Sequence, residues 1–307
     1  MSHLHQSAED YLCLRRALGF TLQRHGRLLP GLVGYLEAAG TTTLTTRLAL
    51  EWATSLEGHP DEWPVRLAIA RGFARYLATF DPATEVPPVD LLPRRRWRPN
   101  PHIYTEAEIS ALLAATATLR HPLRRATHAT LIGLLATTGM RVGEVIGLGR
   151  DDIDQPEGCL TVRRAKFGAS RELPLHQTTM DALAAYAGVR DEHWPTAKSQ
   201  AFFVSATGTR LCYTNVRSTF AGLVEVAGIK PRAGCSPPRI HGLRHFFAVA
   251  AVTRWYREGA DVAASMPALS AYLGHAAPSG TYWYLTATPE LLALAAARLD
   301  QDGQRRP

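Results

Sequence analysis

A run of prolines between residues 81 and 101 constrains the fold of this chain more than any other feature of its sequence. Six prolines fall here, at positions 82, 87, 88, 93, 99 and 101. Proline lacks a backbone N–H and fixes φ, so neither a helix interior nor a central strand can run through this segment. A chain of 307 residues is long enough for two hydrophobic cores. We therefore expect two domains, residues 1–80 and 102–307, joined by a linker at 81–101.

The first 80 residues have the apolar spacing of helices. Leucines recur at helical intervals between residues 7 and 38, where Gly19, Gly26 and Pro30 are the expected interruptions. Threonines at 41–46 are candidate N-caps for a second helical region that runs through Leu56. A third helix is expected from about Trp63 to residue 79. The N-terminal domain should thus be entirely helical.

The second domain should be helical around a small antiparallel hairpin. Thr105 and Glu108 have the spacing of a capping box, so a helix should begin between them. Another should stop at Gly139, and the next should open at Arg141. Alternating residues at 159–165 and 171–175 predict two strands, with Lys166 at their tip. Residues 213–228 and 241 onward should be mainly helical, with a loop between helices at 266–267.

Composition favours a basic cytoplasmic protein with a polyanionic partner. The net charge is +7 and the isoelectric point is near 9.5. Cys13, Cys159, Cys212 and Cys235 are widely spaced, which predicts neither a zinc site nor a disulfide framework. The N-terminus lacks a basic-then-apolar signal pattern, and the longest apolar stretch, 129–140, is short and interrupted by threonines. We expect no membrane association.

The second domain also contains side chains that can break and remake a phosphodiester. His241 and Arg244 are three residues apart, so one face of a helix presents an imidazole and a guanidinium together. Arginine is permanently charged and bidentate toward phosphate, and fixed cations can stabilise the charge of the transition state without Mg²⁺. A tyrosine hydroxyl can attack phosphorus and conserve the phosphoester bond energy for rejoining. A lysine can protonate the leaving 5′-oxygen. Such a reaction needs no cofactor, metal or ATP.

These residues resemble the tyrosine recombinase (phage integrase-like) family. Its pattern is an Arg after a Thr-Gly turn, a Lys in a β-hairpin, His-x-x-Arg, Leu-Gly-His, and a Tyr shortly afterwards. In this chain the pattern falls, in order, on Arg141, Lys166, His241, Arg244, His275 and Tyr284. The hairpin turn AKFGAS departs from the glycines that usually surround this Lys. The resemblance is close over the last two-thirds of the chain and covers the first third in layout alone.

The resemblance implies a fold, a mechanism and partners. The fold is mainly α: a helical core-binding, DNA-binding domain followed by an α+β catalytic domain. Tyr284 would attack to form a 3′-phosphotyrosyl intermediate. Tyr282, two residues earlier, is excluded as the nucleophile by spacing alone. Arg141, Arg244 and His275 would hold the phosphate, Lys166 would protonate the leaving oxygen, and His241 would assist. Double-stranded DNA would be bound by a homotetramer or by a tetramer that includes related recombinase subunits, as in integrases and transposases of mobile elements.

Several alternatives stay open. The linker arginines, Arg94, Arg95, Arg96 and Arg98, either track the DNA backbone or merely aid solubility. Those at 66, 71 and 75 form either a solvated face or a DNA-facing one. The helix expected at 290–299 docks on a neighbouring protomer or caps its own domain. For the whole chain, the other functions considered are an inactive DNA-binding protein of the same fold, a related topoisomerase, and a metal-dependent nuclease using His241, His245 and His275.

Overall fold

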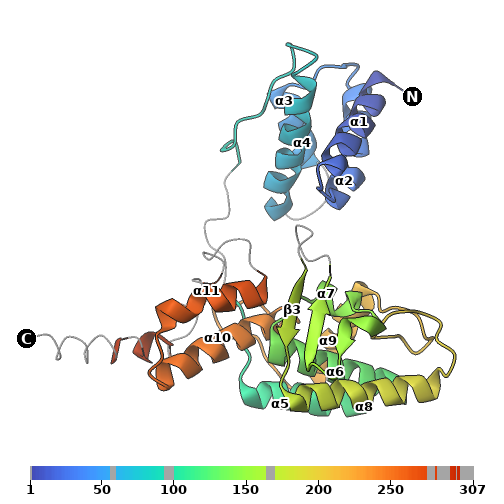
Figure 1. Cartoon of the computed structure of the whole chain (residues 1–307). Coiled ribbons are helices and arrows are strands. Elements are labelled where there is room, and N and C mark those ends of the chain that lie inside the picture. Colours follow the sequence, from blue (N-terminus) through green and yellow to red (C-terminus); the bar gives the residue numbers. More distant parts are fainter. Residues whose placement is uncertain are drawn as a thin grey trace, which may run out of the picture. The chain divides into compact units, whose positions relative to one another are not determined.

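The computed structural model describes residues 2–55, 60–92, 100–163, 170–274, 281, 291–294 and 296–297. Within these ranges the chain is mainly helical and contains one three-stranded antiparallel sheet (Figure 1). The fold class expected from the sequence is confirmed. The chain divides into two compact units, Met1–Arg98 and Pro99–Pro307, and each has a hydrophobic core of its own.

The N-terminal unit is a small bundle of helices. It contains α1 (His3–Ala17), α2 (Gln23–Ala38), α3 (Thr46–Ser55), a 3₁₀ turn η1 (Pro60–Glu62) and α4 (Trp63–Leu77). Gly19 interrupts the first helical region as expected, whereas Gly26 and Pro30 lie inside α2, so the interruptions predicted there are wrong. The buried side chains of α2, Leu29, Leu32, Val33 and Leu36, have the i, i+3, i+4, i+7 spacing of one helical face. Burial of this face outweighs the local cost of glycine and proline.

Part of the expected linker packs on the N-terminal unit. Arg71 of α4 donates from Nε to the Pro87 carbonyl and from Nη2 to the Pro88 carbonyl, both at 2.6 Å. The Glu85 N–H donates to the Leu44 carbonyl at 2.8 Å. Residues 81–92 are therefore held on this unit, although the sequence assigned them to the linker. Arg71 and Arg66 are buried, so they do not form the exposed face expected for them, while Arg75 is exposed.

The C-terminal unit is built around α6. Its helices are α5 (Glu106–Ala115), α6 (Pro122–Thr138), α7 (Val142–Gly147), α8 (Gln177–His193), α9 (Tyr213–Val226), α10 (Gly242–Arg257) and α11 (Val262–Leu273), with 3₁₀ turns η2 (Thr116–Thr118) and η3 (Arg150–Asp152). Helices α8 and α10 both pack along α6. The capping box at Thr105 and Glu108 is confirmed, with both reciprocal hydrogen bonds present.

The sheet has the strand order β1-β2-β3. The predicted hairpin is observed as β2 (Cys159–Val162) and β3 (Arg171–Pro174), with Leu160 opposite Leu173 and Val162 opposite Arg171. A short strand that the sequence did not predict, β1 (Ile153–Asp154), pairs with the outer edge of β2.

Helices α10 and α11 pack on each other at one end of this unit (Figure 1). The loop predicted at 266–267 is wrong, because Pro267 lies inside α11. The buried residues Val262, Met266, Leu269 and Leu273 follow the helical repeat and hold α11 on α10 through the proline. Leu291, in a helical stretch at 291–294, is fully buried in the same apolar cluster.

Candidate active site

A tight turn at the end of α6 places Arg141. Gly139 is the C-cap of α6 in the left-handed conformation, with φ at +62°. A Cβ there would lie 2.5 Å from Cδ1 of Phe247 and 2.9 Å from Cδ2 of Leu273. Glycine is therefore required twice, by the backbone conformation and by the close approach of α10 and α11. Arg141 then forms the N-cap of α7, as the sequence predicted.

Glu144 orients Arg141 and also caps its helix. Nη1 of Arg141 donates to Oε1 of Glu144 at 2.8 Å, and the backbone N–H of Arg141 donates to Oε2 at 2.9 Å. Nη2 of Arg141 donates to the Gly274 carbonyl at 2.9 Å. The Arg141 side chain is still 28% exposed. Its guanidinium is thus fixed on two sides and accessible from outside.

A second arginine, Arg171 at the start of β3, binds the same carboxylate. Its Nη2 donates to Oε2 of Glu144 at 2.9 Å and its Nη1 to Oε1 at 3.2 Å. Its Nε donates to the Tyr272 carbonyl at 2.9 Å. Burial raises the pKa of Glu144, but the bonds from Arg171 and Arg141 outweigh it and hold the pKa below the ordinary range. Glu144 is therefore an ionised carboxylate between two arginines.

Arg171 was missed by the sequence reasoning, although a signal was present. Residues i and i+2 of a strand share a face, so Arg171 lies on the same face as Leu173, which is buried. An arginine that faces inward needs a carboxylate or carbonyl partner. The alternation that predicted β3 could have identified it.

Arg244 lies in the first turn of α10 and is almost completely buried, with 2% exposed. Its Nη1 donates to the Gly139 carbonyl and its Nη2 to the Leu273 carbonyl, both at 2.8 Å. His241, the N-cap of the same helix, is exposed. The rings of His241 and His245 meet edge to face, with centroids 4.9 Å apart. His245 therefore packs against His241.

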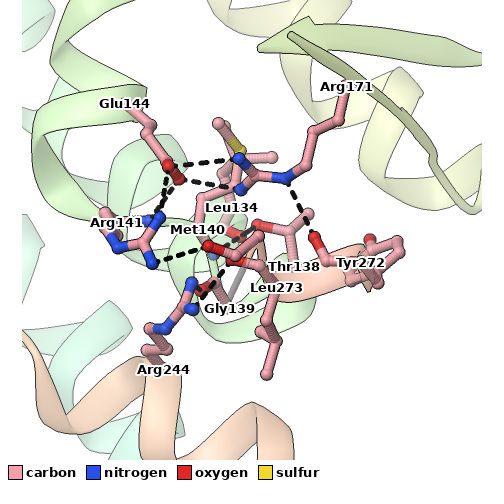
Figure 2. A network of polar contacts seen from close by, with 11 residues as sticks. Leu134, Thr138, Gly139, Met140, Arg141, Glu144, Arg171, Arg244, Tyr272 and Leu273 are labelled. Carbon is pink, nitrogen blue, oxygen red and sulfur yellow. Dashed lines mark hydrogen bonds and ion pairs between the residues drawn. The ribbon is translucent and has the colours of Figure 1, made fainter. Parts of the chain in front are cut away.

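Three arginines meet at the end of α11. The consecutive carbonyls of Tyr272, Leu273 and Gly274 accept hydrogen bonds from Arg171, Arg244 and Arg141, respectively (Figure 2). The last carbonyls of a helix lack intrahelical partners and carry the negative end of its dipole, so they attract cations. The next residue in the sequence is His275. The structure thus brings Arg141 and Arg244, from separate helices, to the end of the segment that precedes His275.

The other predicted site residues lie outside the described residues. These are Lys166, His275, Tyr284 and the linker arginines Arg94, Arg95, Arg96 and Arg98. Among the residues that are described, no three His, Cys, Asp or Glu side chains are grouped closely enough to hold a metal ion. In the same part of the chain, no helix is long and apolar enough to span a membrane.

Comparison with known proteins identifies the family. Residues 103–290 match the model of the phage integrase family. The chain belongs to the phage integrase family. This family member is 41% identical to the putative integrase/recombinase y4rE of Sinorhizobium fredii, over 98% of this chain and 97% of that protein. It is 31% identical to the tyrosine recombinase XerD of Mycobacterium tuberculosis, over 92% of both chains.

Solved structures agree on the fold of this phage integrase family member. The Tn1549 transposon integrase, in complex with transposon right end DNA, superposes with a TM-score of 0.63 at 17% identity, over 96% of this chain and 98% of that one. A lambda integrase dimer bound to a COC′ core site gives a TM-score of 0.58 at 18% identity, over 92% and 77%. Both similarities extend over residues of the two units, so the fold is shared.

Proposed function

We propose that this phage integrase family member is a site-specific DNA recombinase of the integrase or transposase kind. It cleaves and rejoins strands through a covalent 3′-phosphotyrosyl intermediate, without a metal or ATP. The observation that carries the proposal is the meeting of Arg141 and Arg244 at the end of α11, directly before His275. Fixed guanidinium groups are the donors that a phosphoryl transfer without a metal requires, because charge develops on the non-bridging oxygens.

Each proposed role follows from the chemistry of its side chain. Tyr284 attacks phosphorus, and Lys166 protonates the leaving 5′-oxygen. Arg141 and His275 hold the phosphate together with Arg244, and His241 assists proton transfer or positioning. Of the two arginines, Arg141 is the one whose side chain is partly exposed in this structure.

Arg244 is buried in this structure, with both Nη groups on carbonyls. We propose that a phosphate takes the place of the Leu273 carbonyl on Nη2, since a phosphate oxygen is a stronger acceptor for a guanidinium than a neutral carbonyl is.

The proposed partner is double-stranded DNA, bound by a tetramer of this chain. The basic net charge of +7 supports a polyanionic partner. Among proteins of the same fold, a lambda integrase tetramer is bound to a Holliday junction. The N-terminal helical unit would supply the core-binding domain, and Arg94, Arg95, Arg96 and Arg98 would follow the DNA backbone between the two units. The recombining partner subunits would be identical copies or related recombinases.

The test is covalent attachment to DNA. The substrate is a duplex that carries any inverted repeats or attachment site found by sequencing the DNA that flanks the gene, with a nick close to the scissile position so that a short strand is lost after cleavage. The wild-type chain should form an adduct that survives denaturing electrophoresis, and EDTA should not prevent it. Tyr284→Phe should form none while it binds the duplex nearly as well as the wild type, because the ring is retained and the nucleophilic oxygen is lost.

Tyr282→Phe is the matched control, since the same change two residues away should leave adduct formation intact. An adduct with Tyr284→Phe but none with Tyr282→Phe would reverse the assignment of the nucleophile. Cleavage that EDTA abolishes and Mg²⁺ restores would instead indicate a metal-dependent nuclease. Relaxation of supercoiled DNA that lacks the repeats would indicate a topoisomerase.

A further inference from the structure

Arg171 joins three parts of the site that are far apart in the sequence. It begins β3, and Lys166 lies five residues before it in the sequence, in the segment between β2 and β3. Its Nη groups hold Glu144 of α7, and its Nε holds the Tyr272 carbonyl at the end of α11 (Figure 2). A Cβ on Gly274 would lie 2.8 Å from Nη1 of Arg171, so the backbone before His275 packs directly on this guanidinium.

The hydrogen bonds to Glu144 link Arg171 to Arg141. Oε1 of Glu144 accepts from Nη1 of both arginines, and Oε2 accepts from the Arg141 backbone N–H and from Nη2 of Arg171. Both carboxylate oxygens are therefore fixed from two sides. Without Arg171, the carboxylate could rotate, and Arg141 would lose the fixed partner that aims its guanidinium.

The charges of these side chains are a second reason why Arg141 depends on Arg171. Two arginines and one carboxylate carry a net charge of about +1, whereas Arg141 and Glu144 alone would be neutral as a pair. The Arg171 side chain is 14% exposed and Glu144 is 9% exposed, so solvent screens this triad only weakly. Arg171 therefore preserves the positive potential that Arg141 presents to a phosphate.

We propose that Arg171 is a positioning residue for strand cleavage: through Glu144 it aims Arg141, and through the Tyr272 carbonyl it fixes the end of α11 before His275. This inference rests on the proposed recombinase function. Arg171 acts on the reaction through its neighbours, because Nε and both Nη atoms already donate to Glu144 and to the Tyr272 carbonyl. Lysine could not replace it, since a single ammonium cannot reach a carboxylate and a carbonyl in the way that the planar fork does.

The experiment compares single-turnover cleavage of two substrates at saturating protein. One is the nicked duplex described above, and the other has a neutral methylphosphonate at the scissile position. The methylphosphonate lacks one charged oxygen, so it depends less on arginine for charge stabilisation. The variants are Arg171→Gln, Arg171→Lys, Arg141→Ala and, as a matched control, Arg150→Gln. Arg150 is also partly buried and paired with a carboxylate, Asp191 at 3.0 Å, but it lies outside this network.

Arg171→Gln should slow cleavage of the phosphate substrate by about 10- to 100-fold, the scale expected when a catalytic group is misplaced. Arg171→Lys should be slowed nearly as much, and DNA affinity should change by less than about threefold. On the methylphosphonate, the deficits of Arg171→Gln and Arg141→Ala should shrink together. Arg150→Gln should cleave both substrates like the wild type.

An equal deficit of Arg171→Gln on both substrates would overturn the proposal and indicate a general structural role. Rates equal to wild type on both would overturn it too. If Arg171→Gln folds poorly, Arg171→Lys replaces it, and Glu144→Gln with the corresponding double variant completes a cycle. Residues that act as a unit give effects that do not add, so a double variant no slower than Glu144→Gln supports the proposal, and additive effects oppose it. Failure of the wild type to form any adduct would instead refute the recombinase function.

Discussion

Single arginines in this site differ in what they can do because their surroundings differ. The Arg141 side chain is 28% exposed, that of Arg171 is 14% exposed, and Arg244 as a residue is 2% exposed. All three donate to the end of α11, but Arg141 alone combines a fixed orientation with appreciable access. An accessible arginine can meet a ligand directly, whereas a buried one such as Arg244 must first exchange one of its present partners for that ligand. Exposure therefore assigns the roles that residue type leaves open.

Residue by residue, the sequence predicted the contacts that are local in the chain. Glu144 follows Arg141 by three residues, a spacing that by itself places the two on one helical turn, and Glu144 both orients Arg141 and caps the helix. Arg171 meets Glu144 across 27 residues of sequence and the Tyr272 carbonyl across 101. Such contacts depend on how the sheet packs on the helices, which periodicity does not specify.

Lys166 is the residue whose proposed role has the sharpest chemical test. If it protonates the leaving 5′-oxygen, Lys166→Ala should slow cleavage by a factor on the order of 10² to 10⁴, the usual range for general acid catalysis. DNA binding should change little. A substrate with sulfur in place of the bridging 5′-oxygen releases a thiolate as its leaving group, and a thiolate needs no proton. It should restore cleavage to Lys166→Ala but not to Arg141→Ala, whose defect lies in charge stabilisation.

Two results of the same assay would exclude this role. Equal rescue of both variants would mean that the defect of Lys166→Ala is not the loss of a proton donor, so the acid would lie elsewhere. Rescue of neither would mean that Lys166 serves as a groove contact, and His241 would become the next candidate for the acid.

For whole elements, helix ends were easier to predict than helix continuity. The capping box at Thr105 and the stop at Gly139 depend on side chains within one turn, and both are observed. Pro30 and Pro267 were expected to break helices, yet each lies inside one. In both helices a buried apolar face continues past the proline. The free energy of burying that face comes from tertiary packing, so a local rule could not include it.

The turn at Gly139 should be the least tolerant of substitution among these helix ends. Gly139→Ala places a Cβ within 2.5 Å of Phe247 and forces a side chain onto a backbone with φ at +62°. The left-handed conformation alone costs an L-residue about 1–2 kcal/mol, and the clash adds to it. Denaturant unfolding should show a loss of at least that size. Cleavage should also fall, since the turn positions Arg141.

Gly133→Ala is the matched control for this turn. Gly133 lies in the interior of α6, and nothing within 4 Å would meet its Cβ. Alanine is a better helix former than glycine, so this variant should be stabilised, by up to about 1 kcal/mol. A Gly139→Ala variant as stable as Gly133→Ala would show that α10 and α11 move easily at this turn.

For the whole molecule, the sequence located the boundary between the two units. It did not show which residues near that boundary pack on a unit. The prolines indicated where regular structure stops, and the division of the chain into two units falls between residues 98 and 99. Residues 81–92 nevertheless pack on the N-terminal unit, because Arg71 donates to two carbonyls of the Pro87-Pro88 pair. A segment without regular hydrogen bonding can still be held by one buried guanidinium. The proline content of a segment indicates that it lacks regular hydrogen bonding. It does not indicate whether tertiary contacts hold the segment in place.

Both units should lose stability in mild acid, for the same physical reason. Burial, together with Arg15 nearby, lowers the pKa of His25 in the N-terminal unit, and burial lowers the pKa of His102 and His128 in the C-terminal unit. Below the ordinary histidine pKa of about 6.5, the unfolded chain binds protons that these folded imidazoles resist. Their contribution to stability is therefore complete above that pH and is lost as the pH falls toward their lowered values.

Calorimetric melting at pH 7.5 and pH 5.5 checks this expectation. The melting temperature of each unit should be lower at pH 5.5, and each kcal/mol lost from a unit of the C-terminal unit's size lowers it by roughly 2–4 °C. Glu144 contributes little over this interval, because a carboxylate whose pKa is lowered stays ionised until the pH nears or passes below about 4.3. His128→Gln removes one titrating imidazole, so the pH-dependent loss should shrink in the C-terminal unit and stay unchanged in the N-terminal one. Equal melting temperatures at the two pH values would mean that the buried imidazoles take up protons as readily in the folded chain as in the unfolded one.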